Sequence, residues 1–329
     1  MATYYDIFGQ KVQYLSSDPA NLTEGQVWYN STSNTAKVQG FGTAAWASAA
    51  PMPNGLSGMS GGGSTTSGLT LGGDNGGGFP TWPTATQEFD GTNWSAGGNY
   101  PTSGNSIGIS GTNQTTLLGV GANLNGPVSS GTASYNGSAW SAETSYPTGI
   151  GGAWGFGAET AAVFFGGGTG FFGGSPFPTA SNEYNGSAWT GGGTMPTGRM
   201  NARGTGILTA GLSVGSNTAT SPETNVTLEY DGSSWTAGGS LSQAGGRGAA
   251  TGSITSAFYF GRDSSPNTAT ERYDGTSWAA DLSMSSGHPG AGCFGTNSLS
   301  AIAGGFYPGV GTTEEYTGAG PVTQTITTS

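Results

Sequence analysis

Residues 229–239 read Glu229-Tyr230-Asp231-Gly232-Ser233-Ser234-Trp235-Thr236-Ala237-Gly238-Gly239, and the centre of this stretch returns along most of the chain. The shared pattern is an aromatic residue, Asp or Asn, Gly, two small residues and Trp. Its five complete copies begin at Phe89, Tyr135, Tyr184, Tyr230 and Tyr273. A degenerate copy begins at Phe41, and a truncated copy at Tyr316 ends the series. The leading aromatics are 43 to 49 residues apart, a spacing typical of repeated structural units.

A short apolar run that ends in Gly recurs with the same period, once between each pair of leading aromatics. The six runs span residues 69–73, 117–119, 162–166, 207–211, 257–261 and 301–305. A continuous apolar run is typical of a buried strand, and the Gly-rich stretch before it suits a strand crowded near an axis. Asp-Gly or Asn-Gly between β-formers predicts a hairpin with a two-residue type I′ turn. Each repeat therefore predicts four short strands, as in one blade of a β-propeller.

The two ends of the repeat region complement each other. The last repeat stops at Tyr316 before any Trp, whereas the first begins with an unpaired Trp strand near Trp46. We therefore expect an all-β, six-bladed propeller over residues 41–318, in which the N-terminal strand completes the last blade and hides a sheet edge. Residues 1–40 are expected to form an N-terminal attachment arm, and residues 319–329 a C-terminal tail.

Composition excludes several classes of function. Seven Lys and Arg stand against 18 Asp and Glu, a net charge of −11, so we expect no nucleic-acid partner. No apolar run is long enough for a membrane helix, and the N-terminus lacks the regions of a signal peptide, so we expect synthesis in a cytosol and no membrane insertion. His288 and Cys293 are single, which excludes an intrachain disulfide and any site with two His ligands. We expect no cofactor.

No enzyme is expected either, because the sequence offers no convergent acid, base and nucleophile. The copper site of galactose-oxidase-type propellers needs two His ligands, which this chain lacks. The Asp-box of sialidases also ends in Gly-x-x-Trp, but its Asp does not adjoin the Gly as it does here. An arginine cluster of sialidase type, made from Arg199, Arg203 and Arg247, is the minor alternative. The repeated Asp90, Asp231 and Asp274 are interpreted as turn residues rather than metal ligands, since Asn replaces Asp in two copies.

The repeats resemble kelch repeats over residues 41–318, with a shorter Tyr-to-Trp spacing and a Gly-Gly pair in only some copies. They resemble more closely the kelch-like proteins encoded by marine bacteriophages, whose repeats read like residues 229–239. Residues 24–35 are similar to a short hairpin common in phage structural proteins.

This resemblance implies a virion structural protein, such as a tail fibre or tail-tip component, that presents its propeller to the host surface or to neighbouring subunits. The implied partners are other virion proteins and a host glycan or protein, with homo-oligomers on the particle. The alternatives are a capsid surface or decoration protein, and a secreted carbohydrate-binding propeller.

Three groups of aromatic residues are candidates for function or packing. The candidate partner-binding residues, in long loops, are Phe79, Trp82, Phe171, Phe172 and Phe177. Packing over the propeller face is the alternative for them. The candidate attachment residues of the arm are Tyr4, Tyr5, Phe8, Trp28 and Tyr29. The repeated tryptophans are expected to pack between blades rather than bind sugar, and they are Trp46, Trp94, Trp140, Trp189, Trp235 and Trp278.

Overall fold

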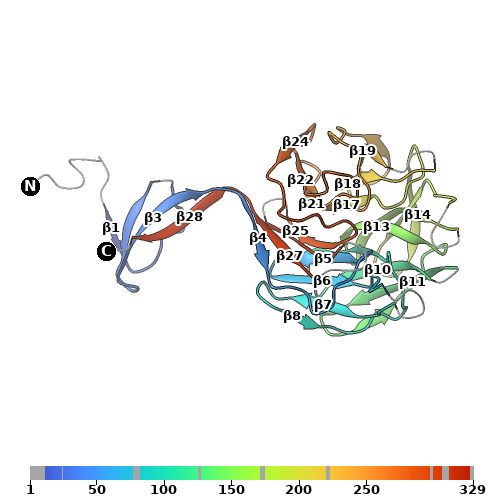
Figure 1. Ribbon diagram of the computed structural model, residues 1–329, viewed down its shortest axis with the longest axis horizontal. Coiled ribbons are helices and arrows are strands. Elements are labelled where there is room, and N and C mark those ends of the chain that lie inside the picture. The colour runs from blue at the N-terminus through green and yellow to red at the C-terminus, as the bar shows by residue number, and fades with distance from the viewer. Residues whose placement is uncertain are drawn as a thin grey trace, which may run out of the picture. The chain divides into compact units, whose positions relative to one another are not determined.

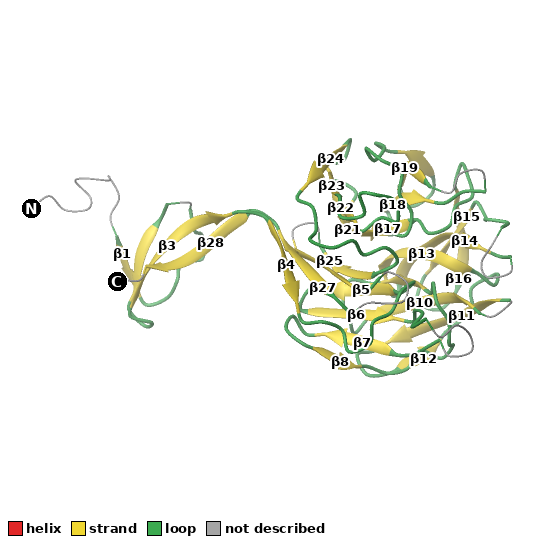
Figure 2. Ribbon diagram, in the orientation of Figure 1, coloured by secondary structure: helices red, strands yellow, loops and turns green. Residues whose placement is uncertain are grey.

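The computed structural model describes residues 12–23, 25–76, 82–124, 127–170, 175–219, 223–296, 299–305 and 311–326 (Figure 1). Within these ranges the regular elements are all β-strands, which confirms the all-β prediction (Figure 2). None of these residues belongs to a helix that could cross a membrane. The strands form seven four-stranded sheets, and the chain divides into two compact units, Met1–Ala45 with Thr317–Ser329 and Trp46–Tyr316.

Six of the sheets, called the repeat sheets below, follow the repeats of the sequence. Their first strands are β5 (Ser60–Ser64), β9 (Gly108–Ser110), β13 (Gly151–Ala158), β17 (Arg203–Ile207), β21 (Ala249–Ser253) and β25 (Gly292–Gly295). Their second strands are β6 (Ser67–Leu71), β10 (Leu117–Asn123), β14 (Ala161–Gly168), β18 (Ala210–Ser216), β22 (Ser256–Phe260) and β26 (Leu299–Ala303). Their third strands are β7 (Thr86–Phe89), β11 (Val128–Tyr135), β15 (Ala180–Tyr184), β19 (Thr224–Tyr230), β23 (Thr270–Tyr273) and β27 (Thr313–Thr317). Their fourth strands are β8 (Trp94–Ala96), β12 (Trp140–Ala142), β16 (Trp189–Thr194), β20 (Trp235–Ala237), β24 (Trp278–Asp281) and β4 (Ala45–Ala49).

The first strands lie side by side around a common axis. Each contacts the first strand of the next sheet, and β25 contacts β5, so that the series returns to its start. The approach is too close for side chains: a Cβ atom at Gly61 of β5 would lie 2.6 Å from the carbonyl oxygen of Cys293 in β25. This radial order of four-stranded sheets is that of a β-propeller, and it explains why the first strands are rich in Gly.

The repeated tryptophans connect each sheet to the one before it. In the β9–β12 sheet, Trp140 packs on Tyr135 with ring centroids 4.9 Å apart, and its Nε1 donates to Oγ1 of Thr86 in the preceding sheet over 2.9 Å. The other five indole N–H groups also donate to the preceding sheet or to the segment that follows it: Trp46 to Leu282, Trp94 to Ala50, Trp189 to Thr144, Trp235 to Ser181 and Trp278 to Thr227. Each indole therefore satisfies its polar atom while burying apolar surface.

Three of the tyrosines that open a motif make a second connection to the preceding sheet. The hydroxyl of Tyr273 donates to Oε1 of Glu229 over 2.6 Å and accepts from the backbone N–H of Gly239 over 3.2 Å. Tyr135 and Tyr230 make the same two bonds to the sheet that precedes their own and the segment after it, with Glu88 and Gly98 and with Glu183 and Gly193. Burial, and after it the hydrogen bond to Glu229, raises the pKa of Tyr273 to about 12. The hydroxyl therefore remains protonated and able to donate at any physiological pH.

The hairpin of the motif has a longer loop than the predicted type I′ turn. Tyr230 pairs directly with Trp235, so four residues form the loop. The carboxylate of Asp231 accepts the N–H groups of Ser233 and Ser234, each over 2.8 Å, and Gly232 alone takes a positive φ of 96°. The other four copies share this arrangement. The Asp or Asn is thus bonded to the turn itself, which accounts for the interchange of the two residues.

We expect Gly193→Ala to destabilise the protein, because a Cβ atom there would lie 2.6 Å from the carbonyl oxygen of Ser233 in the next sheet. Overpacking against backbone costs about 1–3 kcal/mol. Gly191 provides a matched control in the same strand, since nothing lies within 4 Å of the position that a Cβ atom would take there. Gly191→Ala should change the free energy of unfolding by less than about 0.5 kcal/mol. Urea denaturation measures both variants. Equal changes in the free energy of unfolding would show that the close backbone approach at Gly193 does not set the cost.

The seventh sheet, called the terminal sheet, corrects the sequence analysis, which counted six sheets. It consists of β1 (Gln13–Leu15), β2 (Val27–Asn30), β3 (Thr35–Gly42) and β28 (Gly320–Ile326). Strand β28 pairs antiparallel with β3 from Gly320–Gly42 to Ile326–Ala36. The arm and the tail were expected to be separate segments, but their described residues share one sheet. No repeat marker signals this pairing, because it joins segments from opposite ends of the chain.

Asp18 organises a polar cluster at the surface of the terminal sheet. Its carboxylate accepts hydrogen bonds from Lys37 Nζ at 2.6 Å, Asn30 Nδ2 at 2.8 Å and Trp28 Nε1 at 2.9 Å. The bond from Lys37, followed by those from Asn30 and Trp28, lowers the pKa of Asp18 to about 2. Trp28 is fully buried beside it.

Acid is expected to weaken the terminal sheet, because the pKa of Asp18 lies below its usual value of 3.8 in the folded chain. A carboxyl with a lowered pKa stabilises the fold above its unfolded pKa, and the contribution is lost as the pH falls towards about 2. The indole N–H resonance of Trp28 should therefore shift or broaden over this range in the wild type. Asp18→Asn should remove the pH dependence of this resonance. An unchanged titration in that variant would show that another group causes it.

Candidate functional site

A ring of backbone hydrogen bonds runs around the axis where the chain enters the first strands. Each repeat sheet contributes one residue in the left-handed conformation: Gly58, Ser106, Gly152, Asn201, Arg247 and Gly290, with φ between 52° and 71°. The N–H groups of five of them donate to the carbonyl of the ring residue in the preceding sheet, from Ser106 to Gly58 through to Gly290 to Arg247. Met59 closes the ring by donating to Gly290 over 3.1 Å.

Three of the six ring positions carry side chains in spite of this conformation. Glycine meets the backbone requirement at no steric cost in three sheets, whereas a left-handed residue with a Cβ costs about 1–2 kcal/mol. Asn tolerates the conformation best, but Ser106 and Arg247 do not share that tolerance. Strained residues of this kind concentrate at functional sites. The side chains of Ser106, Asn201 and Arg247 therefore mark this end of the axis as the candidate site.

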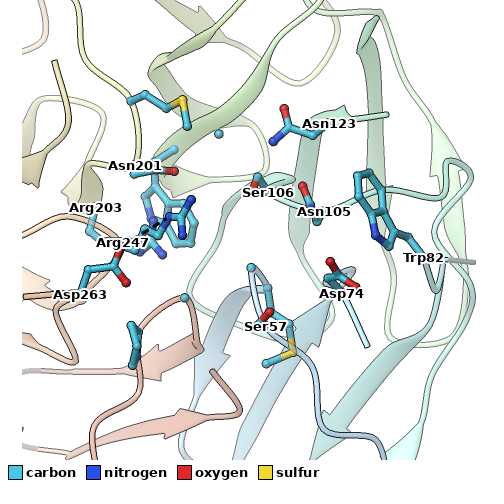
Figure 3. Close-up of a pocket in the computed structure, with 17 residues that line it drawn as sticks. Ser57, Asp74, Trp82, Asn105, Ser106, Asn123, Asn201, Arg203, Arg247 and Asp263 are labelled. Atoms are coloured by element: carbon cyan, nitrogen blue, oxygen red, sulfur yellow. Dashed lines mark ion pairs between the residues drawn. The ribbon is translucent and has the colours of Figure 1, made fainter. Parts of the chain in front are cut away.

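The ring surrounds a cavity of about 470 Å³, called the axial cavity (Figure 3). Its volume lies within the roughly 300–1,000 Å³ of typical ligand pockets. All six ring residues line it, together with residues at or just after the ends of the second strands, such as Asp74, Asn123 and Asp263. Single β-bridges hold two of these residues in place, Asp74 through Ser57 and Asn123 through Asn105. The wall of the cavity is thus formed by segments next to the first and second strands, and every repeat sheet contributes a residue to it.

Two arginines occupy one side of the axial cavity. Arg203 is almost fully buried, and its guanidinium carbon lies 3.9 Å from the centroid of the Trp154 ring. Burial lowers the pKa of Arg203 to about 10, so it remains a cation at neutral pH. Arg247 is half exposed, and its Nε lies 3.7 Å from Oδ2 of Asp263. This side of the cavity therefore holds two cations and one anion.

The opposite side is lined by two asparagines, an aspartate and a tryptophan. Figure 3 shows Asn105, Asn123, Asp74 and Trp82 across the cavity from Arg203, Arg247 and Asp263. The Oδ1 atoms of Asn105 and Asn123 are buried and accept no hydrogen bond. Leaving such an acceptor unpaired costs about 1–3 kcal/mol. Neither oxygen has surface open to the axial cavity, so both are unpaired acceptors inside its wall.

Comparison with known proteins supports the fold. The chain is similar to the solved protein whose structure is titled "Structure of YjhT", with a TM-score of 0.64 and 15% sequence identity. The match covers 83% of this chain and 99% of that one. At this identity it supports the propeller and carries no statement about function. No family model matches the sequence, and no curated protein matches it.

The candidate loop aromatics do not form a common surface among the described residues. Trp82 is buried in the wall of the axial cavity, whereas half-buried Phe177 lies outside that wall. Phe79, Phe171 and Phe172 lie outside the described residues. In the arm, Trp28 is buried and Tyr29 stacks on Tyr14 with ring centroids 5.0 Å apart, while Tyr4, Tyr5 and Phe8 lie outside the described residues.

Of the three arginines considered for a sialidase-type cluster, two share the axial cavity. Arg203 and Arg247 line it, whereas the buried Arg199 is not among its lining residues. Sequence reasoning missed Asn105, Asn123 and Asp74, which resemble ordinary loop residues. One signal could have found part of the site. The position that is Gly in three repeats is Ser106, Asn201 and Arg247 in the others.

The single His and Cys are not among the residues that line the axial cavity. His288 is fully buried, with Nδ1 2.7 Å from the carbonyl oxygen of Gly304 and Nε2 3.6 Å from Glu314. Cys293 is buried in β25, and burial raises the pKa of its thiol. Over the described ranges no group of three or more His, Cys, Asp or Glu is arranged to hold a metal ion.

Proposed function

We propose that this chain is a non-enzymatic structural and recognition protein of a bacteriophage particle, such as a tail fibre or tail-tip component. In this proposal the six repeat sheets are the blades of a closed propeller that recognises a host surface, with β4 as the outer strand of the last blade. The terminal sheet attaches the chain to other virion proteins and to further copies of itself. The resemblance of residues 229–239 and 24–35 to phage structural proteins supports a place on a phage particle.

Exposed apolar residues on the terminal sheet carry the proposal of attachment. Six large apolar side chains are exposed among the described residues, and three of them, Val12, Tyr14 and Ile326, belong to the small unit that holds the chain ends. Tyr14 is 75% exposed. Exposed apolar groups concentrated on one unit favour a protein partner there.

The chemistry of the axial cavity favours binding over catalysis. Its described carboxylates already have partners, since Asp263 pairs with Arg247 and Asp74 accepts the N–H of Gly76 over 2.8 Å. Neither His288 nor Cys293 lines this cavity. An enzyme of this fold would need a positioned acid, base or nucleophile at the axis.

Electron microscopy of purified particles with gold-labelled antibodies tests the proposal. We expect label at a defined place on the particle and loss of particle-bound protein in Tyr14→Ser. Leu299→Ser is the matched control, because Leu299 is 48% exposed on a repeat sheet. Particles without label would overturn the proposal. Protein free in the medium would favour the secreted carbohydrate-binding alternative, and label over the capsid would favour the decoration protein.

A further inference from the structure

Strand β28 forms an open edge of the terminal sheet, since β3 is its one neighbouring strand among the described residues. It is seven residues long and carries no charged residue, and its pairing with β3 shows no register shift. The strand at the opposite edge, β1, has three residues. Natural proteins keep open edges short, charged or bulged, because an unpaired edge is a template for another strand. Strand β28 is neither short, charged nor bulged.

The outer edges of the repeat sheets differ from β28. Their fourth strands span three to six residues. The longest of them, β16, pairs with β15 across a register shift between Ala180 and Asn182, and a bulge of this kind bends an edge away from a second strand. Among the described edges, β28 is therefore the one best suited to pair with a further strand.

The backbone of β28 presents hydrogen-bonding groups on its open side. Gln39 of β3 lies opposite Thr323, and its N–H donates to the carbonyl of Gln26, beside β2, over 2.8 Å. Backbone groups alternate in direction along an antiparallel ladder, so those of Thr323, Thr325 and Pro321 point away from β3. Proline has no N–H to donate. The open side therefore presents the N–H groups of Thr323 and Thr325, and the carbonyls of all three residues.

We propose that β28 pairs antiparallel with β28 of a second copy of this chain, which joins two terminal sheets into one continuous sheet. Around a twofold axis at Gln324, Thr323 lies opposite Thr325 of the partner subunit, and Thr325 lies opposite Thr323 of the partner subunit. Each of these pairs exchanges two backbone hydrogen bonds, so both outward N–H groups of each copy find an acceptor. The inference rests on the proposed attachment through the terminal sheet and names the strand that binds the further copy.

Charge and symmetry favour a second copy as the occupant. The chain has a net charge of −11, so two copies approach most easily through a segment without charge, such as β28. An antiparallel pair of identical strands is self-complementary about a twofold axis, which a closed dimer requires. The pairing also places Ile326, which is 46% exposed, opposite Val322 of the partner subunit. It therefore gives one of the exposed apolar residues of the terminal sheet an apolar neighbour.

Sedimentation velocity of the full chain at high micromolar concentration tests the proposal, and we expect a dimer. The side chains of Thr323 and Thr325 are exposed, so both positions accept charge. Replacing both by Glu, or both by Lys, places like charges opposite each other and should raise the dissociation constant of the dimer at least about tenfold in low-salt buffer. An equimolar mixture of the two double variants should restore the dimer, because each Glu then lies opposite a Lys.

Two controls separate loss of pairing from loss of folding. The indole N–H resonance of Trp28 should be unchanged in both double variants, because the terminal sheet remains folded. Tyr14→Ser alters β1 at the opposite edge and should leave the dimer intact. A monomeric wild type, or a dimer that survives in the variant with two Glu residues, would overturn the proposal. Since sedimentation uses purified chain, its failure leaves the location on the particle as a separate question.

Discussion

A chain that spans residues 50–318 is expected to lose the cooperative unfolding transition that a chain spanning residues 45–318 retains. The two chains differ only in β4, which lies beside β27 in the sheet that contains β25 and β26. Trp46 of β4 packs against Phe258, Phe260 and Tyr316, with ring centroids between 5.3 and 5.8 Å apart. Trp46 is half-buried, so its own loss costs less than the about 3–5 kcal/mol of a fully buried Trp, but it is lost together with the strand pairing of β4, and whole domains are stable by only about 5–15 kcal/mol.

Loss of β4 also exposes the edge of β27, and an unpaired edge is a template for aggregation. Differential scanning calorimetry and size-exclusion chromatography of the two chains would measure both effects. Both chains lack the terminal sheet, so its absence cannot explain a difference between them. Trp46→Ala in the full chain should reproduce part of the loss. Equal melting temperatures for the two chains would show that β4 does not close the ring.

Glu271→Ala is expected to destabilise the protein by about 3–5 kcal/mol, because it leaves a buried cation without its partner. Arg262 and Glu271 are each about 1% exposed, and Nη2 of Arg262 lies 2.6 Å from Oε1 of Glu271. Glu271 also accepts the N–H of Ser242 over 2.8 Å, which joins two neighbouring sheets. Removal of the carboxylate would strand both donors inside the protein.

Two controls test whether burial sets this cost. Asp263→Ala breaks the more exposed pair with Arg247 and should cost no more than about 1 kcal/mol. The double variant Arg262→Met with Glu271→Leu should recover most of the loss, because replacing a buried pair by apolar residues is often neutral. Urea denaturation measures all three variants. A small effect of Glu271→Ala would mean that water reaches Arg262.

Local sequence patterns were sufficient to predict the repeat sheets. A continuous apolar run such as 257–261 predicts a buried strand by itself. The Asp or Asn before Gly predicts a turn, because its side chain bonds to backbone N–H groups two and three residues later. The Gly-rich first strands indicated an axis, because only residues without side chains allow the approach of Gly61 to Cys293. The predicted type I′ turn was wrong, since both two-residue and four-residue loops use these residue types and only strand pairing distinguishes them.

The terminal sheet and the axial cavity depend on long-range contacts that no local pattern reports. Strand β3 finds β28 across almost the whole chain, as in the hydrogen bond from Thr323 to Gln39. Asn105 and Asn123 belong to one repeat and Arg203 to another, and each resembles an ordinary polar residue near the end of a strand. They face one cavity only because the first strands meet in a ring. The sequence determines each repeat sheet by itself, because the contacts that form it lie within one repeat. Which side chains line the axial cavity is decided only when the first strands of all six repeat sheets meet.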